Sequence, residues 1–451
     1  MTLACFKAYD VRGRVPEELD EGLARRIGRA FVDVTGAREV VVGRDIRLSS
    51  PSLATALAAG LNESGADVLD IGVCGTEEVY FSTAHSGAGG GIMVTASHNP
   101  PDYNGMKFVR AESRPISGDT GLKDIRRIAE SGEFSKPTRL GERFAIDIMP
   151  GYIEHLLSYV DRATLKPLKI VVHAGNGGAG LIVDKLEPFL PFEFIKVEHE
   201  PDGSFPNGVP NPMLIENHRA PVEALRKHGA DLAISWDGDY DRCFFFDEHG
   251  SFIEGYYIVG LLASVFLQRH PGSTIVHDPR LTWNTLDVVA QGGGKAVQSK
   301  SGHAFIKQTM REVDGIYGGE MSAHHYFRNF SYCDSGMIPW LLVTQIISDT
   351  GKSLSELVGE RIRLFPASGE INRRVEDAAA TIDAVLGNYR SSASNVDFTD
   401  GVSVEFDEWR FNLRASNTEP LIRLNVESRG NEALMREKTA ELLELIGGEP
   451  G

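Results

Sequence analysis

The sequence predicts an α/β protein that consists of three similar α/β domains and a smaller C-terminal α+β domain. Short apolar segments of strand length alternate with segments of helical periodicity, which is typical of α/β domains. The same order of strand, polar loop and helix recurs three times along the 451 residues. We therefore expect four domains, which cover residues 1–145, 146–248, 249–361 and 362–451.

The first domain shows this alternation most clearly. Its first helix, over residues 17–35, carries Leu23, Ile27 and Phe31 on one face. The elements that follow are, in order, a strand over 39–43, a helix over 51–64, a strand over 68–72 and, after a loop, a buried strand over 92–94. Pro51 suits the first turn of the second helix, with Ser49 or Ser50 as its cap.

The pattern returns twice and then changes. The second domain is expected to contain a strand over 168–173, a helix over 179–190 and a strand over 231–236. The third is expected to contain a strand over 273–277, a helix over 282–290 and a strand over 315–317. Strands over 369–375, 402–406, 411–413 and 421–425, followed by a helix over 432–445, are typical of an α+β domain.

Composition excludes several classes of function. The net charge of −17 argues against a nucleic-acid partner, which needs a basic face. An anionic substrate requires basic residues gathered locally against that overall charge. No segment approaches the roughly 20 apolar residues of a membrane span, and the N-terminus has no signal-peptide pattern. The four cysteines are far apart, as expected of free thiols in a reducing cytoplasm.

Residues 91–100, with the sequence GIMVTASHNP, place Ser97 at the end of a buried strand. The apolar residues before it predict the strand, and Pro100 prevents a helix from following directly. In α/β proteins such strand ends face a crevice and carry reactive groups. The same residue types are ordinary in a surface turn, so this segment alone leaves both interpretations open.

Asp237, Asp239 and Asp241 occupy alternate positions after an apolar strand. In extended chain their carboxylates converge, and three such groups suit a hard cation such as Mg²⁺, Mn²⁺ or Ca²⁺. A calcium-binding EF-hand is excluded because its sixth position, which requires glycine, is Arg242, and because the flanking segments are strand-like. A solvated acidic turn is the remaining alternative.

Other polar groups are ambiguous by themselves. Asn104-Gly105 predicts a hairpin turn after Ser97, which would bring Lys107 back beside the serine. Lys107 could then transfer a proton if its pKa were lowered; the alternative is a lysine on an edge strand. A donor-rich loop suited to a phosphate dianion is formed by Arg414, Ser416, Asn417 and Thr418.

The third domain offers a further polar loop. Glu320, Ser322 and His324 stand at alternate positions and could point together toward sugar hydroxyls, although a capped loop explains them equally well. His303 and Arg280 are equally ambiguous. The glycines of residues 175–178 lack the full form of a phosphate-binding motif, so we interpret them as a tight turn.

Four of these motifs occur in an order and at a spacing that identify a family. They are TASHNP at Ser97, DGDYDR over 237–242, GEMSAH over 319–324 and RASNTEP over 414–420. With FKAYDVRG over 6–13, they make the chain similar to the α-D-phosphohexomutase superfamily along its whole length. The resemblance is strongest to bacterial phosphomannomutases and phosphoglucomutases.

This resemblance implies four domains around a central cleft and a phosphate carried on Ser97. Mg²⁺ would be held by Asp237, Asp239, Asp241 and an oxygen of the phosphoserine. The enzyme would interconvert hexose 1- and 6-phosphates of mannose and glucose through a hexose 1,6-bisphosphate, which also serves as activator. It would supply sugar nucleotides for surface polysaccharides, as a cytoplasmic protein that is a monomer.

The resemblance also implies roles for the remaining residues. Arg242 would neutralise charge, while Lys107 and His303 would transfer protons. The other groups would bind substrate: Tyr9, Arg12 and His98 near the serine, Arg280, Glu320, Ser322 and His324 at the sugar, and Arg414, Ser416, Asn417 and Thr418 at the distal phosphate.

Two departures and two alternatives accompany this interpretation. Tyr240 stands where the family often has glycine, and Arg280 stands where many relatives have lysine. Neither removes a charge that the chemistry needs, so we expect activity to survive both. The alternatives are a phosphoglucosamine mutase, which Met321 disfavours because glutamine is expected there in that branch, and a non-catalytic protein that binds phosphosugars.

Overall fold

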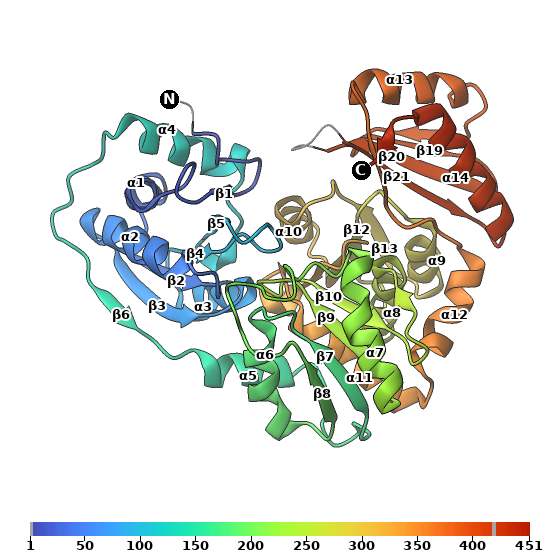
Figure 1. Cartoon of the computed structure of the whole chain (residues 1–451), viewed down its shortest axis with the longest axis horizontal. Coiled ribbons are helices and arrows are strands. Elements are labelled where there is room, and N and C mark those ends of the chain that lie inside the picture. Colours follow the sequence, from blue (N-terminus) through green and yellow to red (C-terminus); the bar gives the residue numbers. More distant parts are fainter. Residues whose placement is uncertain (1–2, 417–420) are drawn as a thin grey trace. The chain divides into compact units, whose positions relative to one another are not determined.

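The computed structural model of the chain describes residues 3–416 and 421–451, and it divides into two compact units. The first unit comprises Met1–Phe252 with Phe327–Ser353, and the second comprises Ile253–Tyr326 with Leu354–Gly451. Each unit contains two β-sheets with their helices (Figure 1). None of the helices in the described residues is long and apolar enough to cross a membrane.

The first sheet of unit 1 has the strand order β1-β5-β4-β2-β3-β6. These strands are β1 (Val11–Arg14), β2 (Glu39–Arg44), β3 (Asp67–Val73), β4 (Gly90–Val94), β5 (Tyr103–Arg110) and β6 (Arg143–Ala145). The helices are α1 (Glu21–Thr35), α2 (Ser50–Glu63), α3 (Thr76–Ser86) and α4 (Lys123–Ser131). β5 runs antiparallel to β1 and β4, whereas β2 is parallel to both β3 and β4.

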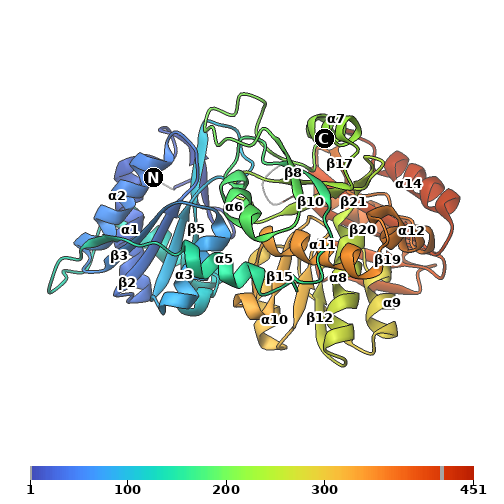
Figure 2. The same ribbon diagram turned by 90° about the horizontal axis from the view of Figure 1, so that it is seen from below.

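Both faces of this sheet are covered by helices, as its alternating residues require. Val40 and Val42 of β2 pack in one core with α1, α2 and α4, whereas Val41 packs in a second core with Val79 of α3. Figure 2 shows α2 and α3 on opposite sides of the sheet. This two-sided burial fixes the register of β2 and β4, and so the position at which β4 ends.

The second sheet of unit 1 has the order β11-β10-β9-β7-β8. Its strands are β7 (Lys169–His173), β8 (Glu193–Val197), β9 (Leu232–Trp236), β10 (Cys243–Phe246) and β11 (Phe252–Ile253). The helices around it are α5 (Met149–Leu157), α6 (Ala179–Leu186), α7 (Arg219–His228) and α11 (Met337–Thr350). α11 packs against β10 and α5, and the indole of Trp236 donates to the carbonyl of Gly336 over 2.9 Å.

Unit 2 contains a sheet with the neighbours β13-β12-β14-β15. Its elements are β12 (Thr274–His277), β13 (Lys295–Gln298), β14 (Tyr317–Gly319) and β15 (His325–Phe327), with α8 (Gly255–Arg269), α9 (Trp283–Gln291), α10 (His303–Glu312) and α12 (Leu354–Leu364). Its C-terminal sheet has the order β18-β19-β20-β21-β17-β22. Those strands are β17 (Ile371–Arg374), β18 (Asn395–Asp397), β19 (Val402–Glu405), β20 (Trp409–Ala415), β21 (Leu421–Ser428) and β22 (Glu449–Pro450). α13 (Ala378–Tyr389) and α14 (Glu432–Ile446) share one core with it.

The predicted repeat is present in the strand order. The first three sheets contain the runs β4-β2-β3, β9-β7-β8 and β14-β12-β13, in which the earliest strand is central and parallel to both neighbours. The last sheet is antiparallel in every registered pair. The prediction of three similar α/β domains and a C-terminal α+β domain is therefore confirmed.

Several local predictions were wrong. Residues 76–86 form helix α3 and not a loop. α1 begins at Glu21 and not at residue 17, because the side chain of Asp20 caps it by accepting from the amide of Leu23. Asn104 and Gly105 lie inside β5 and make no turn. The connection between β4 and β5 is made by residues 95–102 instead.

Candidate active site

Ser97 is buried and not on a surface turn. It follows β4 at the edge where the parallel strands end, and only 3% of its surface is exposed. Its backbone φ of 50° is left-handed, and its amide donates to Oγ1 of Thr95 over 2.9 Å. Its hydroxyl donates to Oδ2 of Asp237 over 2.9 Å and lies 3.1 Å from Nδ1 of His98. The serine therefore faces the acidic loop.

The acidic loop connects two antiparallel strands, β9 and β10, which confirms that it is no EF-hand. The carboxylates of Asp237, Asp239 and Asp241 are buried, and one oxygen from each lies within 4.8 Å of the others. Oδ1 of Asp239 has no hydrogen-bond partner among the described residues. A buried carboxylate oxygen left unpaired is costly unless a cation binds it, so these residues fit a hard divalent ion. The solvated-turn alternative is excluded by their burial.

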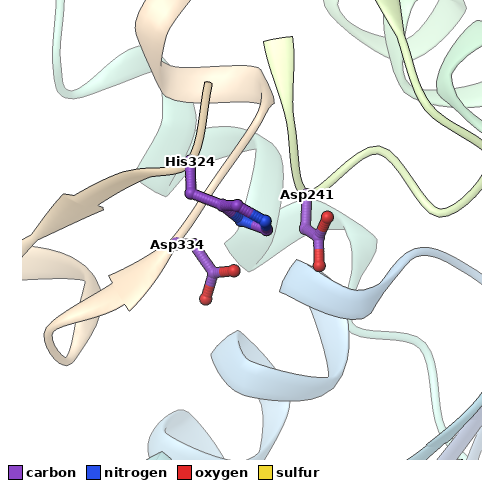
Figure 3. Close-up of side chains that lie close together, drawn as sticks. All are labelled: Asp241, His324 and Asp334. Atoms are coloured by element: carbon purple, nitrogen blue, oxygen red, sulfur yellow. The ribbon is translucent and has the colours of Figure 1, made fainter. Parts of the chain in front are cut away.

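Asp334 adds a fourth carboxylate beside this loop. It belongs to β16 (Cys333–Asp334), and a carboxylate oxygen of Asp334 lies within 4.8 Å of one of Asp241 (Figure 3). Both residues belong to unit 1. Nothing in the sequence around Asp334 indicated this proximity, because the two residues belong to different segments that only the fold brings together.

Lys107 lies at the acidic loop, on a strand that is not an edge. β5 is flanked by β1 and β4, and Lys107 pairs with Met93 of β4. Its ammonium donates to Oδ2 of Asp239 over 2.7 Å and to Oδ2 of Asp241 over 2.5 Å. Burial opposes the charge, but these carboxylates outweigh it and raise the pKa of Lys107. The pKa is raised and not lowered, so Lys107 carries its proton in this arrangement and cannot act as a base.

Arg242 joins the acidic loop to the residue after the serine. Its Nε donates to Oδ2 of Asp237 over 2.9 Å, and its Nη2 donates to Nδ1 of His98 over 2.6 Å. Burial, together with the charge of Arg242, lowers the pKa of His98 well below its usual value. His98 is therefore a neutral acceptor that fixes the guanidinium beside Ser97.

The N-terminal segment contributes a second arginine. Arg12, on β1, donates from Nε to Oδ2 of Asp10 over 2.7 Å and from Nη1 to Oδ1 of Asn99 over 2.6 Å. Asn99 lies two residues after Ser97, so the structure places Arg12 at the serine loop as expected. Tyr9 is half-buried and precedes Asp10.

The acidic loop is held by contacts of Tyr240 and Thr76 that the sequence did not reveal. Tyr240 adopts a left-handed φ of 44°, and its buried hydroxyl donates to Glu78. A Cβ at Gly75 or Gly178 would lie 2.3 or 2.6 Å from the Tyr240 ring, so both glycines leave the space that the ring fills. Oγ1 of Thr76 donates to Oδ2 of Asp239 over 2.5 Å.

Residues 175–178 make the tight turn that the sequence predicts. Gly175 and Asn176 have left-handed φ values of 55° and 58°. The amide of Gly178 donates to the carbonyl of Gly238 in the acidic loop over 3.3 Å. Glycine is required here because the two backbones are in contact, and not because the turn surrounds a phosphate.

In unit 2, Arg280 is the centre of a polar cluster. Its guanidinium is buried, pairs with Asp278, and lies 3.4 Å from Oε1 of Glu320. It also donates to Oγ of Ser322 over 3.1 Å. Oε1 of Glu320 accepts in addition from the amide of Gly302 over 2.8 Å. The structure thus brings Arg280, Glu320 and Ser322 together.

A buried carboxylate connects this cluster to the C-terminal sheet. Glu370 lies 3.5 Å from Arg280, and it accepts from Arg414 over 3.2 Å and from Arg423 over 3.3 Å. Arg414 and Arg423 are direct cross-strand partners on β20 and β21. Burial opposes the charge of Glu370, but the three arginines lower its pKa. Sequence reasoning named Arg280 and Arg414 but missed Glu370 and Arg423.

The remaining expected residues are placed as follows. His303 begins α10, and its ring stacks with that of His324 at a centroid distance of 6.4 Å. Ser416 follows β20, and its amide donates to the carbonyl of Leu421 over 2.8 Å. Asn417 and Thr418, which complete the predicted phosphate loop, lie outside the described residues.

The expected site residues therefore form two groups, one in each unit. Unit 1 holds a buried serine, a set of carboxylates, an ammonium and two arginines in hydrogen-bond contact. Unit 2 holds an arginine-rich cluster with a carboxylate and a hydroxyl. The first group suits metal-assisted transfer to or from a hydroxyl, and the second suits the binding of an anionic, hydroxylated ligand.

Four family models match consecutive parts of the chain, all described as phosphoglucomutase/phosphomannomutase. The α/β/α domain I model matches residues 4–136, domain II matches 150–250, domain III matches 254–365, and the C-terminal domain matches 370–444. A relative from Xanthomonas campestris pv. campestris named "Phosphohexose mutases" is 60% identical over 99% of this chain and 100% of its own length. A phosphomannomutase from Escherichia coli is 57% identical over 98% of this chain and 99% of its own.

Solved structures agree with these matches. The crystal structure of a phosphoglucomutase/phosphomannomutase family protein from Burkholderia thailandensis is 31% identical, with a TM-score of 0.89, and covers 100% of this chain and 99% of that one. A structure described as a putative phosphomannomutase from Thermus thermophilus shares the fold at a TM-score of 0.82 and 23% identity, over 97% of this chain and 98% of that one. With all four domain models matched in order, the chain belongs to the phosphoglucomutase/phosphomannomutase family within the α-D-phosphohexomutase superfamily.

Proposed function

We propose that the chain is a phosphohexomutase that interconverts hexose 1-phosphate and hexose 6-phosphate by way of a phosphate carried on Ser97. The observation that supports this most directly is the contact between the serine hydroxyl and Asp237, within a cluster of carboxylates that Lys107 and Arg242 approach. A buried serine at a strand end beside such a cluster suits phosphoryl transfer, which depends on positioning and charge more than on covalent machinery.

The acidic loop is proposed to hold Mg²⁺ through Asp237, Asp239 and Asp241, with an oxygen of the phosphorylated serine as a further ligand. The unpaired oxygen of Asp239 and the hard, all-oxygen donor set support this choice. When bound, the ion would neutralise negative charge on the phosphoryl group.

The transfer step balances with residues of this chain. A hydroxyl of the hexose phosphate attacks phosphorus, the new P–O bond to the sugar forms, the bond from phosphorus to Oγ of Ser97 breaks, and the proton of the attacking hydroxyl ends on Oγ of Ser97. The product is a hexose 1,6-bisphosphate, which would also serve as activator. In the return step Oγ of Ser97 attacks the other phosphorus and the bond from that phosphorus to the sugar oxygen breaks. Protonated Lys107 gives a proton to the departing sugar oxygen, and the proton released by the serine hydroxyl replaces it. We assign proton transfer at the other end to His303.

The remaining residues are proposed to bind the substrate. Tyr9, Arg12 and His98 would line the site near the serine. Glu320, Ser322 and His324 would contact sugar hydroxyls, with Arg280 fixed among them. Arg414, Ser416, Asn417 and Thr418 would bind the phosphate that is not reacting, and a guanidinium suits that role because its fork matches phosphate oxygens.

Mannose and glucose phosphates are the proposed substrates, because the relatives with more than half of their residues identical include proteins named phosphomannomutase and phosphohexose mutase. Further proposals are four domains around a cleft, a monomer, a cytoplasmic location and a supply of sugar nucleotides for surface polysaccharides. A phosphoglucosamine mutase and a non-catalytic phosphosugar-binding protein are the alternatives that the test must separate.

The test offers the protein mannose 1-phosphate, glucose 1-phosphate and glucosamine 1-phosphate in turn, with Mg²⁺ and a trace of glucose 1,6-bisphosphate. Turnover of the first two is expected. Turnover of only the amino sugar would contradict the proposal, and binding without turnover of any would favour the non-catalytic alternative. Ser97→Ala should take up no phosphate from the bisphosphate. Asp239→Asn should bind Mg²⁺ more weakly in a calorimetric titration, and unchanged binding would exclude the metal assignment.

A further inference from the structure

We infer that Arg47 is a positioning residue that holds the Ser97 loop in the conformation needed for phosphoryl transfer. This inference rests on the proposed function, since it assigns Ser97 as the residue that carries phosphate. Arg47 lies in the connection between β2 and α2, about fifty residues before the serine in sequence, and only 1% of its surface is exposed. In the contacts that the described residues make, it touches no proposed aspartate ligand and no proposed substrate-binding side chain; it contacts Ser97 through the main chain alone.

The guanidinium donates to four main-chain carbonyls of one loop. Nη2 donates to the carbonyl of Ser97 over 2.8 Å and to that of Asn99 over 2.6 Å. Nη1 donates to the carbonyl of Pro100 over 2.7 Å and to that of Tyr103 over 3.0 Å. These acceptors extend from the serine itself to the first residue of β5, so a single side chain holds the whole connection between β4 and β5.

Arg47 is itself fixed from the opposite side. Its Nε lies 3.3 Å from Oδ2 of Asp45, and its amide donates to Oδ1 of the same residue over 3.0 Å. The guanidinium carbon lies 5.2 Å from the centre of the Phe205 ring. A Cβ at Gly203 would lie 2.2 Å from the carbonyl oxygen of Ile46, so the chain packs tightly behind the arginine. The four donors therefore point in defined directions.

A surface ion pair or a general stabilising contact does not account for this arrangement. A buried cation is costly, and Asp45 alone would neutralise it. Four further hydrogen bonds, all to main-chain carbonyls between Ser97 and Tyr103, instead satisfy every Nη position. Only arginine presents donors in a planar fork of this size; a lysine ammonium offers three donors at a single point.

The conformation that Arg47 holds determines where the serine hydroxyl points. Ser97 has a left-handed φ of 50°, which a non-glycine residue adopts only when its surroundings impose it. The carbonyl of Ser97 also contacts the acidic loop, because a Cβ at Gly238 would lie 2.5 Å from it. A rotation of this peptide would therefore move the hydroxyl away from Asp237, 2.9 Å from it.

The experiment compares Arg47→Lys with Arg44→Lys. Arg44 is the last residue of β2, three positions before Arg47. Its side chain is 24% exposed, and its ion-pair partner is Asp70 at 3.9 Å. Phosphate uptake by Ser97 from glucose 1,6-bisphosphate is followed in single-turnover mixing, together with kcat and KM for glucose 1-phosphate. A displacement of about 1 Å in a reacting group costs about 100-fold, so we expect a loss of that order in uptake and kcat for Arg47→Lys, with KM unchanged. Arg44→Lys should resemble the wild type.

Amide hydrogen exchange supplies a readout that does not depend on activity. Residues 97–103 should exchange faster in Arg47→Lys than in Arg44→Lys, while the strands on either side keep their protection. Asp45→Asn, which loosens the arginine without removing it, should show the same pattern with a smaller loss of uptake, and it serves if Arg47→Lys does not fold.

The outcomes are distinct. Normal phosphate uptake by Arg47→Lys, or a loss of protection spread over the whole sheet, would overturn the positioning role and leave the proposed function intact. Absence of phosphate uptake in the wild type would overturn the proposed function. In that case the exchange comparison still decides whether Arg47 holds the loop.

Discussion

Glu77 gives the structure a pH dependence that can be measured. It lies in the first turn of α3 and is fully buried. Its carboxyl group accepts from the hydroxyl of Tyr152, from the amide of Gly336 over 2.6 Å and from the amide of Met337. Burial raises its pKa from 4.5 to about 8, although these donors oppose the shift. We predict that replacing Glu77 by glutamine removes much of the loss of stability that the wild type shows as pH rises.

The sign and the size follow from the shift. In the unfolded chain Glu77 loses its proton near its ordinary pKa of 4.5, whereas in the folded protein it keeps the proton until about pH 8. Folding therefore takes up a proton in this window, and stability is complete below pH 4.5 and declines as pH rises toward 8. One pKa unit corresponds to about 1.4 kcal/mol, so the full effect is about 5 kcal/mol. Glu78, whose pKa burial raises to about 7, adds to the decline in both proteins.

The assay measures the first unfolding transition in urea from pH 5 to pH 9 for the wild type and for Glu77→Gln, which has no group to titrate but retains an acceptor for the two amides. The variant should gain stability relative to the wild type as pH rises, by about 4 kcal/mol across this range as the linkage relation requires. Glu223→Gln, on the exposed face of α7, is the matched control and should follow the wild type. Parallel curves for Glu77→Gln and the wild type would refute the argument that Glu77 is protonated in the folded protein.

Three further substitutions test the acidic loop and the arginine cluster. Gly178→Ala would place a Cβ 2.6 Å from the Tyr240 ring, and we expect a loss of about 1–3 kcal/mol in stability together with weaker Mg²⁺ binding, measured by melting and by titration calorimetry. Gly359→Ala in α12, where a Cβ meets no atom within 4 Å, should leave both unchanged. Tyr240→Phe removes the hydrogen bond to buried Glu78 and should cost about 1–3 kcal/mol, with a larger cost at pH 9 than at pH 5; equal costs would contradict the pairing. Glu370→Gln leaves Arg280, which is buried, and two further arginines without their shared carboxylate. We expect unit 2 to lose about 3–5 kcal/mol in stability, measured as a lower melting temperature that added phosphate partly restores. An unchanged melting temperature would exclude the role of Glu370 in holding the arginines.

The fold and the acidic loop were predictable because their signals are local. The buried strands β2, β4, β7 and β9 are short apolar runs followed by small or polar residues, and the pattern repeats. The three aspartates were also predictable from their spacing in one segment, although they converge through a turn, closed by the amide of Tyr240 on the carbonyl of Asp237, and not through extended chain. Lys107 lies at the acidic loop that Ser97 contacts, but no turn at Asn104-Gly105 brings it there, because pairing with β1 and β4 holds that pair in β5.

Contacts between distant segments were not predictable. α3 was missed although glutamates such as Glu77 and Glu78 are common in the first turn of a helix. What the sequence could not show is that this turn is buried: Thr76 bonds Asp239, Glu77 bonds the start of α11, and Glu78 bonds Tyr240. The pKa of Lys107 is raised by carboxylates that lie more than a hundred residues away in the sequence. The sequence around Lys107 therefore could not show that its pKa is raised and not lowered.

Tyr240 shows how the fold accommodates a tyrosine in a left-handed backbone conformation. A glycine in this position could adopt the left-handed φ of 44° at no steric cost, whereas a tyrosine requires compensation. The ring is fully buried and packs against Gly75, just before α3, and Gly178, just before α6. Its hydroxyl donates to Glu78. A buried aromatic ring contributes more to stability than the strained backbone costs. Since Asp239 and Asp241 flank this residue in sequence, its anchored ring fixes the peptides that carry both carboxylates. The tyrosine therefore anchors the acidic loop and leaves all three aspartates in place.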